Sequence, residues 1–259
     1  MARGYLFLGL FAATHCALAV LFPFSWPRLV LFAVLYGLGT GTMLFLLFHP
    51  ANGWLVENRS RLDNTRAVAL TFDDGPDPAD TPRLLDLLRE KGVRATFFVV
   101  GRRAEAHPEI VRRAWEEGHL IGNHTWSHRP LFCFLPPWRL RREIERGTEA
   151  IRRACGQRPR YFRSPVGLRH PFLRPALKRA GLEFVSWRLR SLDTRIRNAE
   201  ELEKRIVNRA QGGDIILLHD RRSEGAQPML RALPGVIDSL RARGFSFALA
   251  GAREEAERS

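Results

Sequence analysis

Short apolar runs alternate with amphipathic stretches along most of this chain. The apolar runs predict strands near residues 68–72, 95–100, 120–123, 161–163, 183–189, 215–218 and 245–249. Apolar residues at helical spacing predict helices over 81–91, 109–117, 138–154, 171–180, 199–210 and 229–243. This alternation predicts a parallel sheet with helical crossovers, and therefore an α/β fold. In a (β/α) barrel, functional groups lie where the strands end.

The first 50 residues differ, because they hold two long apolar runs without a charge, at about 5–22 and 29–48. Each run is long enough for a membrane-spanning helix, so we expect a transmembrane hairpin and a multi-pass protein of a bacterial-type cytoplasmic membrane. A cleaved signal peptide ending near Ala17-Leu18-Ala19 and a soluble core hairpin are the alternatives. The flanking arginines do not decide which side carries the remaining chain. The expected domains are a hairpin at 1–50, a linker at 51–65, an α/β domain at 66–250 and a tail at 251–259.

The composition changes this picture little, but it excludes several classes of protein. Of the 259 residues, 45% are hydrophobic and 26% are charged, which excludes a disordered chain. Three cysteines without a Cys-x-x-Cys pair exclude a disulfide framework and a cysteine zinc knuckle. The formal net charge of +14 favours anionic partners. We nevertheless expect no nucleic-acid partner, because no nucleic-acid-binding motif accompanies the charge.

Candidate metal ligands follow two of the predicted strands. Asp73 and Asp74 come directly after the first strand, where a turn can bring both carboxylates to one cleft. His124 and His128 are four residues apart, which predicts two imidazoles on one face of a helical turn. Two imidazoles and one carboxylate leave a position open for water, as in hydrolytic zinc sites. An ordinary turn and two unrelated histidines remain the alternative interpretation of each pattern.

Three other strand ends carry candidate acid or positioning groups. His219 ends a strand and titrates near neutral pH, so it is a candidate general acid. Arg163 precedes a rigid Ser-Pro turn and could hold a carboxylate in place. Asp193 follows another strand and could orient His219 and favour its charged form. A surface arginine and an ordinary turn histidine are the corresponding alternatives.

Five segments carry these residues, in the order Thr71–Pro76 (TFDDGP), His124–His128 (HTWSH), Arg163–Gly167 (RSPVG), Trp187–Asp193 (WRLRSLD) and Leu217–Asp220 (LLHD). Together they resemble the motifs of the polysaccharide deacetylase family with the NodB-type domain, carbohydrate esterase family 4. The resemblance covers about residues 66–250 and implies a distorted (β/α) barrel. Two positions depart from the family pattern: Val166, where an aromatic residue is frequent, and Arg190, where an acid is frequent.

The resemblance also implies a metal site. Asp74, His124 and His128 would bind a divalent cation, with zinc as the first choice and cobalt or another divalent ion as alternatives. Asp73 would be the general base that activates water, and Arg163 would position it.

The remaining implied roles concern the leaving group and the substrate. His219 would be the general acid that protonates the leaving amine, and Asp193 would tune it. The backbone N–H of Val166 would help to stabilise the oxyanion. Trp187 and Leu217 would line the acetyl-binding pocket.

We therefore expect a membrane-attached, metal-dependent hydrolase that removes N-acetyl groups from amino-sugar units of a polysaccharide or cell-wall glycan. A deacylase of a polyprenyl-phosphate-linked amino sugar is the second interpretation, because a membrane hairpin would hold the site near such a carrier. An inactive glycan-binding or scaffold protein is a third. The complete set of candidate ligands and acid–base residues disfavours this last interpretation.

Overall fold

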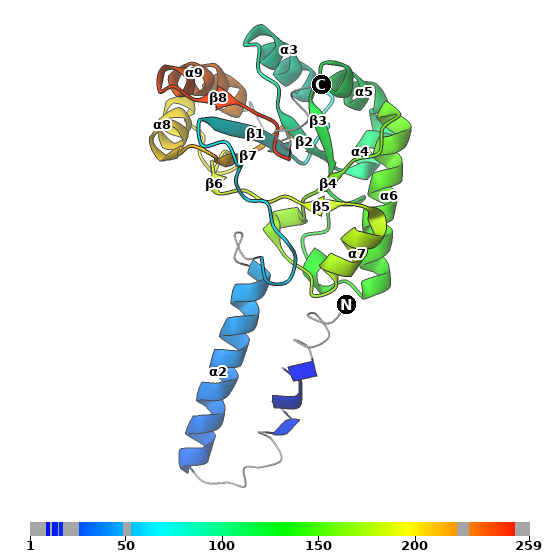
Figure 1. The fold of residues 1–259 in the computed structure, drawn as a ribbon, viewed down its shortest axis with the longest axis vertical. Coiled ribbons are helices and arrows are strands. Elements are labelled where there is room, and N and C mark those ends of the chain that lie inside the picture. Colours follow the sequence, from blue (N-terminus) through cyan, green and yellow to red (C-terminus); the bar gives the residue numbers. More distant parts are fainter. Residues whose placement is uncertain are drawn as a thin grey trace.

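The computed structural model describes residues 9–10, 12–14, 16–17, 26–48, 53–221 and 228–251. Its strands form one parallel sheet (Figure 1). The strands are β1 Ala67–Asp73, β2 Thr96–Val99, β3 Leu120–Asn123, β4 Tyr161–Phe162, β5 Glu183–Phe184, β6 Leu189–Arg190, β7 Ile215–His219 and β8 Ser246–Phe247. Each lies within or next to an apolar run that predicted a strand, so the α/β prediction is confirmed.

The strand order makes the sheet an open, curled half-barrel. Neighbouring strands follow the order β5-β4-β3-β2-β1-β7-β6, and β8 pairs with the first residues of β1. The consecutive strands β5 and β6 therefore occupy the two edges of this path. β1, which is buried along its whole length, lies between β2 and β7 in the middle. Its last residue, Asp73, is in register with His219 of β7.

The chain before β1 pairs with the residue that follows β5 and with the residue that precedes β7. Arg59 pairs in parallel with Val185, just after β5, and Arg61 pairs antiparallel with Asp214, just before β7. The Arg59 carbonyl accepts a hydrogen bond from the Ser186 backbone at 2.9 Å. The single strand predicted at 183–189 is instead two short strands, and between them the Ser186 backbone bonds to Arg59 rather than to a neighbouring strand.

The helices flank the sheet (Figure 1). They are α3 Thr81–Glu90, α4 Gly101–Ala106, α5 Pro108–Glu116, α6 Pro137–Cys155, α7 Leu173–Ala180, α8 Ala199–Arg209 and α9 Pro228–Ala242, with short 3₁₀ helices at η1 Phe132–Phe134 and η2 Pro165–Gly167. The pattern of apolar residues did not predict α4. That helix buries only Gly101 and Ala104, so no apolar periodicity indicates it.

The predicted transmembrane hairpin is wrong, and so is the predicted multi-pass localisation. Helix α2, Trp26–Phe48, extends from the α/β body (Figure 1). Among the helices of the described residues, however, none is both long and apolar enough to cross a membrane. In α2 the apolar run is interrupted near its middle by Gly39-Thr40-Gly41-Thr42, whereas a bilayer core requires about 20 predominantly apolar residues in succession. Most of the first predicted span, and tail residues 252–259, lie outside the described residues.

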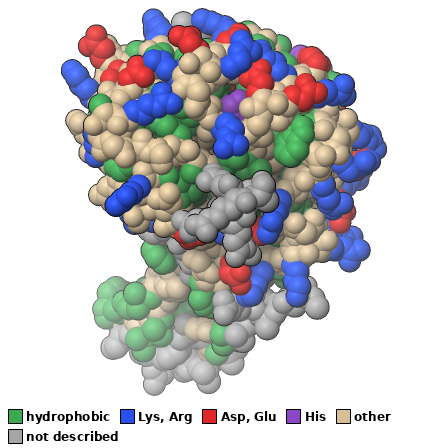
Figure 2. Space-filling model, turned by 45° about the horizontal axis from the view of Figure 1, so that its top comes forward, with side chains coloured by type: hydrophobic (Ala, Val, Ile, Leu, Met, Phe, Trp, Pro, Cys, Tyr) green, Lys and Arg blue, Asp and Glu red, His purple; other side chains and the backbone are tan. Residues whose placement is uncertain are grey.

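The excess of positive charge is distributed over the face of the molecule drawn in Figure 2. Lys and Arg side chains there alternate with Asp and Glu side chains and do not gather in a single patch. Several of the arginines pair with carboxylates on the surface, for example Arg152 with Glu149 at 2.8 Å. That the protein has no nucleic-acid partner stays a prediction from the sequence.

Candidate metal and catalytic site

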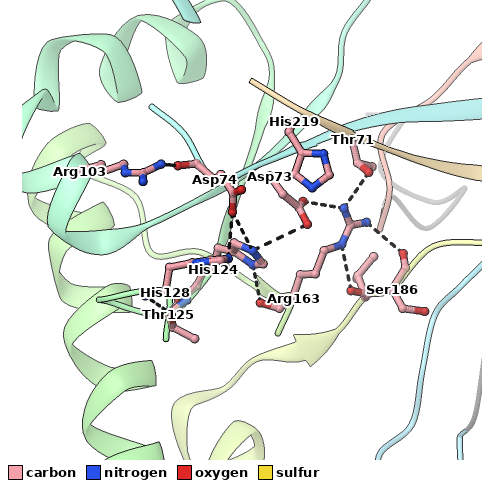
Figure 3. A network of polar contacts seen from close by, with 12 residues as sticks. Thr71, Asp73, Asp74, Arg103, His124, Thr125, His128, Arg163, Ser186 and His219 are labelled. Carbon is pink, nitrogen blue, oxygen red and sulfur yellow. Dashed lines mark hydrogen bonds and ion pairs between the residues drawn. The ribbon is translucent and has the colours of Figure 1, made fainter. Parts of the chain in front are cut away.

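Two consecutive carboxylates lie side by side where β1 ends. Asp73 is the last residue of the strand and is 3% exposed. Asp74 has φ = 78°, a left-handed conformation that non-glycine residues seldom adopt. The chain turns sharply there, so the Asp74 carboxylate lies on the same side as that of Asp73 rather than opposite to it (Figure 3). The turn is held by Arg103, which donates a hydrogen bond to the Asp74 carbonyl oxygen.

The two candidate histidine ligands lie on an irregular loop after β3, and not on the helical turn that their spacing predicted. Thr125 and His128 both have positive φ, 66° and 51°. The His128 backbone N–H donates to Thr125 Oγ1 at 3.0 Å, which fixes the loop internally. The imidazoles of His124 and His128 nevertheless meet, with 4.9 Å between ring centroids. The two imidazoles therefore lie together as the spacing predicted, but an irregular loop rather than a helical turn places them there.

The neighbouring helices hold this histidine loop in place. The Gly101 backbone at the start of α4 donates to the Thr125 carbonyl at 2.9 Å. From α6, Glu143 accepts a hydrogen bond from the Ser127 backbone at 2.8 Å. Asn123 accepts one from the Thr125 backbone at 2.7 Å. Each of these contacts satisfies a loop backbone group, which limits the movement of the two imidazoles.

Asp74, His124 and His128 converge on one point. His128 Nε2 lies 2.9 Å from Asp74 Oδ1, and His124 Nε2 lies 3.5 Å from the same oxygen (Figure 3). One potential ligand atom from each residue lies within 4.8 Å of the other two. Burial alone would raise the pKa of Asp74, but the two neighbouring imidazoles outweigh it and hold this pKa well below its usual range. The carboxylate is therefore ionised, as a metal ligand must be.

The hydrogen bonding of His124 fits a metal ligand. Its Nδ1 lies 2.8 Å from the Arg163 carbonyl oxygen, which can only accept, so Nδ1 carries the proton. The lone pair is then on Nε2, and this buried atom has no hydrogen-bond partner. A carbonyl that fixes the ring and tautomer of a histidine is the usual support of a metal ligand. These donors, two imidazole nitrogens and one carboxylate, fit a divalent cation such as zinc.

Arg163 binds Asp73 from inside the barrel. Its guanidinium is completely buried, and Nη1 donates to Asp73 Oδ1 at 2.7 Å. Nη1 also donates to Thr71 Oγ1 at 2.7 Å, and Nη2 donates to the Ser186 carbonyl at 3.0 Å (Figure 3). Because the guanidinium is planar and has several fixed partners, Asp73 is held in one orientation. Its other oxygen, Oδ2, lies 3.8 Å from His124 Nε2.

His219 lies beside Asp73 on the adjacent strand, and Asp193 supports it. His219 Nδ1 lies 2.9 Å from Asp193 Oδ1, and the His219 backbone N–H donates to Asp193 Oδ2 at 2.7 Å. Burial lowers the pKa of His219, but the hydrogen bond and charge of Asp193, together with Asp73 and Asp74, raise it overall to about 9. The imidazole is consequently protonated at neutral pH and able to donate a proton.

Comparison with known proteins identifies this arrangement. The sequence profile of the family described as "Polysaccharide deacetylase" matches residues 61–185. A chitooligosaccharide deacetylase of a Bradyrhizobium species is 35% identical over 199 residues, which cover 73% of this chain and 90% of that protein. The chain belongs to the polysaccharide deacetylase family. The resemblance found in the sequence is thereby confirmed, as is the expectation of a hydrolase of amide bonds.

Two further comparisons agree with this family. A peptidoglycan-N-acetylglucosamine deacetylase of Bacillus cereus is 36% identical over 187 residues, covering 71% of this chain and 66% of that protein. The solved structure of a family 4 carbohydrate esterase from Streptomyces lividans, in complex with acetate, matches with a TM-score of 0.64 and 31% identity. That match covers 75% of this chain and 96% of the other. The half-barrel is thus a fold that this family shares.

The three residues that the deacetylase motifs assign to the substrate lie close together. Val166 has φ = 57° and its side chain is 58% exposed, so it stands on the surface where the family pattern often has an aromatic residue. Trp187 is 7% exposed and packs against Gly167, where an added Cβ would lie 2.5 Å from the indole. Leu217 belongs to the same buried cluster as Trp187. Their roles toward substrate remain predictions.

Sequence reasoning missed two polar residues of the site. Thr71 lies inside the first deacetylase motif, but the motif does not indicate its hydrogen bonds. Its hydroxyl accepts a hydrogen bond from Arg163 and donates one to the Ile216 carbonyl oxygen at 2.7 Å. Arg103 has no motif around it and comes from the helix that the pattern did not predict. No signal in the sequence indicates its contact with Asp74.

The interpretation of the protein as a deacylase of a lipid-linked amino sugar is no longer supported. That interpretation depended on a membrane hairpin that would place the site near a polyprenyl carrier. The hairpin is contradicted, and the curated relatives compared above are named for peptidoglycan and chitooligosaccharides.

Proposed function

We propose that this protein is a metal-dependent deacetylase that removes N-acetyl groups from amino-sugar units of a cell-wall or chitin-like glycan. The observation that carries the proposal is the convergence of Asp74, His124 and His128 beside Asp73, with the His219–Asp193 pair on the next strand. The names of the relatives support the substrate class. The donor set supports zinc as the ion.

The chain's own residues supply the proton transfers. A divalent cation held by Asp74, His124 and His128 would supply a Lewis acid for the acetyl carbonyl and would make a neighbouring water more acidic. Asp73 accepts the proton of the attacking water, because its carboxylate is fixed by Arg163 with one oxygen directed toward the ligand cluster. A positioned base of this kind contributes about 10²–10⁴-fold to the rate.

The later step needs an acid. The amide nitrogen is a poor leaving group until it gains a proton, and protonated His219 can donate that proton from Nε2 because Nδ1 is bound to Asp193. The backbone N–H of Val166 stabilises the developing negative charge on oxygen, a form of stabilisation that is large when the donors are fixed in advance. Trp187 and Leu217 form the apolar wall against which the acetyl methyl group packs.

An acetate-release assay tests this function. Purified full-length protein, loaded with Zn²⁺, is incubated with chitotetraose and with soluble peptidoglycan fragments, and the products are analysed by mass spectrometry. We expect stepwise loss of acetyl groups from at least one substrate, and no loss with Asp73→Asn. Glycan binding without acetate release by the wild-type protein would instead favour the inactive glycan-binding interpretation.

A further inference from the structure

Asp220 is a buried carboxylate that the proposed mechanism does not use. It follows His219 directly and is 2% exposed. Its Oδ2 accepts a hydrogen bond from Thr81 Oγ1 at 2.8 Å, whereas Oδ1 is buried without a hydrogen-bond partner. Burying a carboxylate with so few partners is costly. The position of this group therefore needs a reason other than packing.

The carboxylate of Asp220 lies directly against the turn that carries the candidate ligand Asp74. A Cβ added to Gly75 would lie 2.0 Å from Asp220 Oδ2 and 2.4 Å from its Cγ. Only glycine allows this approach. The Asp220 backbone N–H also donates to the Asp73 carbonyl at 3.2 Å. Asp220 thus contacts the residues on both sides of Asp74.

Thr81 extends this support to the next part of the turn. Its hydroxyl donates to Asp220 and accepts a hydrogen bond from the Asp77 backbone at 2.7 Å. Thr81 is the first residue of α3, so one carboxylate and one hydroxyl tie the turn to a helix and to the end of β7. Asp74 needs such support, because a left-handed conformation at a non-glycine residue persists only when its surroundings impose it.

We propose that Asp220 is a positioning residue for the metal ligand: through Gly75 and Thr81 it holds the turn that presents the Asp74 carboxylate to His124 and His128. This inference rests on the proposed metal site and deepens it. Groups that orient a metal ligand from behind are worth about 10–100-fold in metal affinity. Asp220→Ala is therefore expected to weaken Zn²⁺ binding by about that factor, with KM for the glycan little changed.

The test measures metal affinity directly. Zn²⁺ dissociation constants of the full-length wild type, Asp220→Ala, Asp220→Asn and Thr81→Val are obtained by competition with a chromophoric chelator, and the visible absorption of the Co²⁺ forms reports the ligand geometry. Asparagine keeps an acceptor for Thr81, so Asp220→Asn is expected to retain most of the affinity. Thr81→Val should weaken binding in the same direction as Asp220→Ala, and the double variant should be no weaker than Asp220→Ala alone.

Asp214 provides the matched control. It is also buried, carries an orphaned Oδ1 and lies at the other end of β7, where it pairs with Arg188 at 2.9 Å. Asp214→Ala should reduce the stability of the fold, measured by urea unfolding, and leave Zn²⁺ affinity unchanged.

The outcomes separate this inference from the proposed function. Wild-type affinity in folded Asp220→Ala, or an equal loss of affinity in Asp214→Ala, would overturn the positioning role. If Asp220→Ala does not fold, Thr81→Val decides: unchanged affinity there overturns the role as well. A wild-type protein that binds no divalent cation would overturn the proposed metal site itself.

Discussion

His219 is held by both oxygens of Asp193: one lies 2.9 Å from the imidazole Nδ1, and the other accepts the backbone N–H of His219 at 2.7 Å. Two contacts from one carboxylate fix the orientation of the ring as well as its charge. Because Nδ1 is occupied, the proton available for transfer is the one on Nε2.

Asp193→Asn should move the alkaline limb of the pH–rate profile to lower pH. The pKa of His219 is raised to about 9, with Asp193 as the main cause that opposes burial. A general acid works only while protonated, so kcat/KM falls as the pH rises through this pKa. Loss of the Asp193 charge should move the midpoint of this limb to lower pH by about one pH unit or more. A divalent cation would offset the contribution of Asp74 to the pKa of His219 in wild type and in Asp193→Asn alike. The quantity to measure is therefore the difference in pH between the alkaline limbs of the two profiles. Coincident alkaline limbs would contradict the role of Asp193.

The same interaction makes a prediction for folding. The pKa of His219 is higher in the folded protein than its ordinary value of 6.5. Its contribution to the free energy of unfolding is therefore complete below pH 6.5 and is lost as the pH rises through about 9. In urea unfolding, wild type should lose more stability over this interval than Asp193→Asn does.

Arg163→Met should destabilise the fold and reduce the rate. The variant leaves Asp73 buried without its cation, and breaking a buried pair in this way costs about 3–5 kcal/mol. Urea unfolding measures the loss, and kcat should fall because Asp73 is no longer oriented. Arg160→Met is the control, since Arg160 pairs with Glu183 on the surface at 3.0 Å and such pairs contribute about 0–1 kcal/mol. Similar losses of stability in Arg163→Met and Arg160→Met would show that the buried Arg163–Asp73 pair contributes no more than a surface pair.

Much of the fold could be predicted because each local pattern agrees with the sheet. The apolar run at Leu120–Asn123 is a strand with the predicted bounds, and the basic amphipathic stretch at 138–154 lies within α6. Parallel strands all end at the same edge, so polar residues after different strands become neighbours. This geometry brings Asp73 beside His219, a pairing between residues 146 positions apart that no local pattern contains.

The remaining features depend on information that a local pattern does not carry. Spacing predicted that His124 and His128 share a helical turn, but positive φ angles and contacts with α4 and α6 determine the loop. Helix α4 escaped prediction because small residues form its buried face. The membrane hairpin was predicted from the length of two uncharged apolar runs, and the structure contradicts it.

Removal of the metal should abolish activity and lower stability together. A ligand that binds only the folded protein stabilises it by about 2.7 kcal/mol at 100 times its Kd. Treatment with a chelator should therefore stop acetate release and lower the Tm, and added Zn²⁺ should restore both.

His128→Ala should remove the Zn²⁺-dependent rise in Tm, whereas His107→Ala should keep it, because His107 lies between α4 and α5 and outside the ligand cluster. A Zn²⁺-dependent rise that survives in His128→Ala would remove this histidine from the ligand set.

Gly167→Ala should impair both stability and catalysis, because it displaces Trp187. Gly167 has φ = 73°, and an added Cβ would lie 2.5 Å from the indole ring. Gly181, at the end of α7, provides the comparison: its φ is 68°, but no atom lies within 4 Å of an added Cβ. Both variants incur the cost of a left-handed conformation, about 1–2 kcal/mol, which urea unfolding should detect. Only Gly167→Ala should also reduce kcat/KM for acetate release, since only there must the indole of Trp187, a residue of the candidate acetyl pocket, move. Equal catalytic efficiency in the two variants would show that the packing of Trp187 on Gly167 does not shape the site.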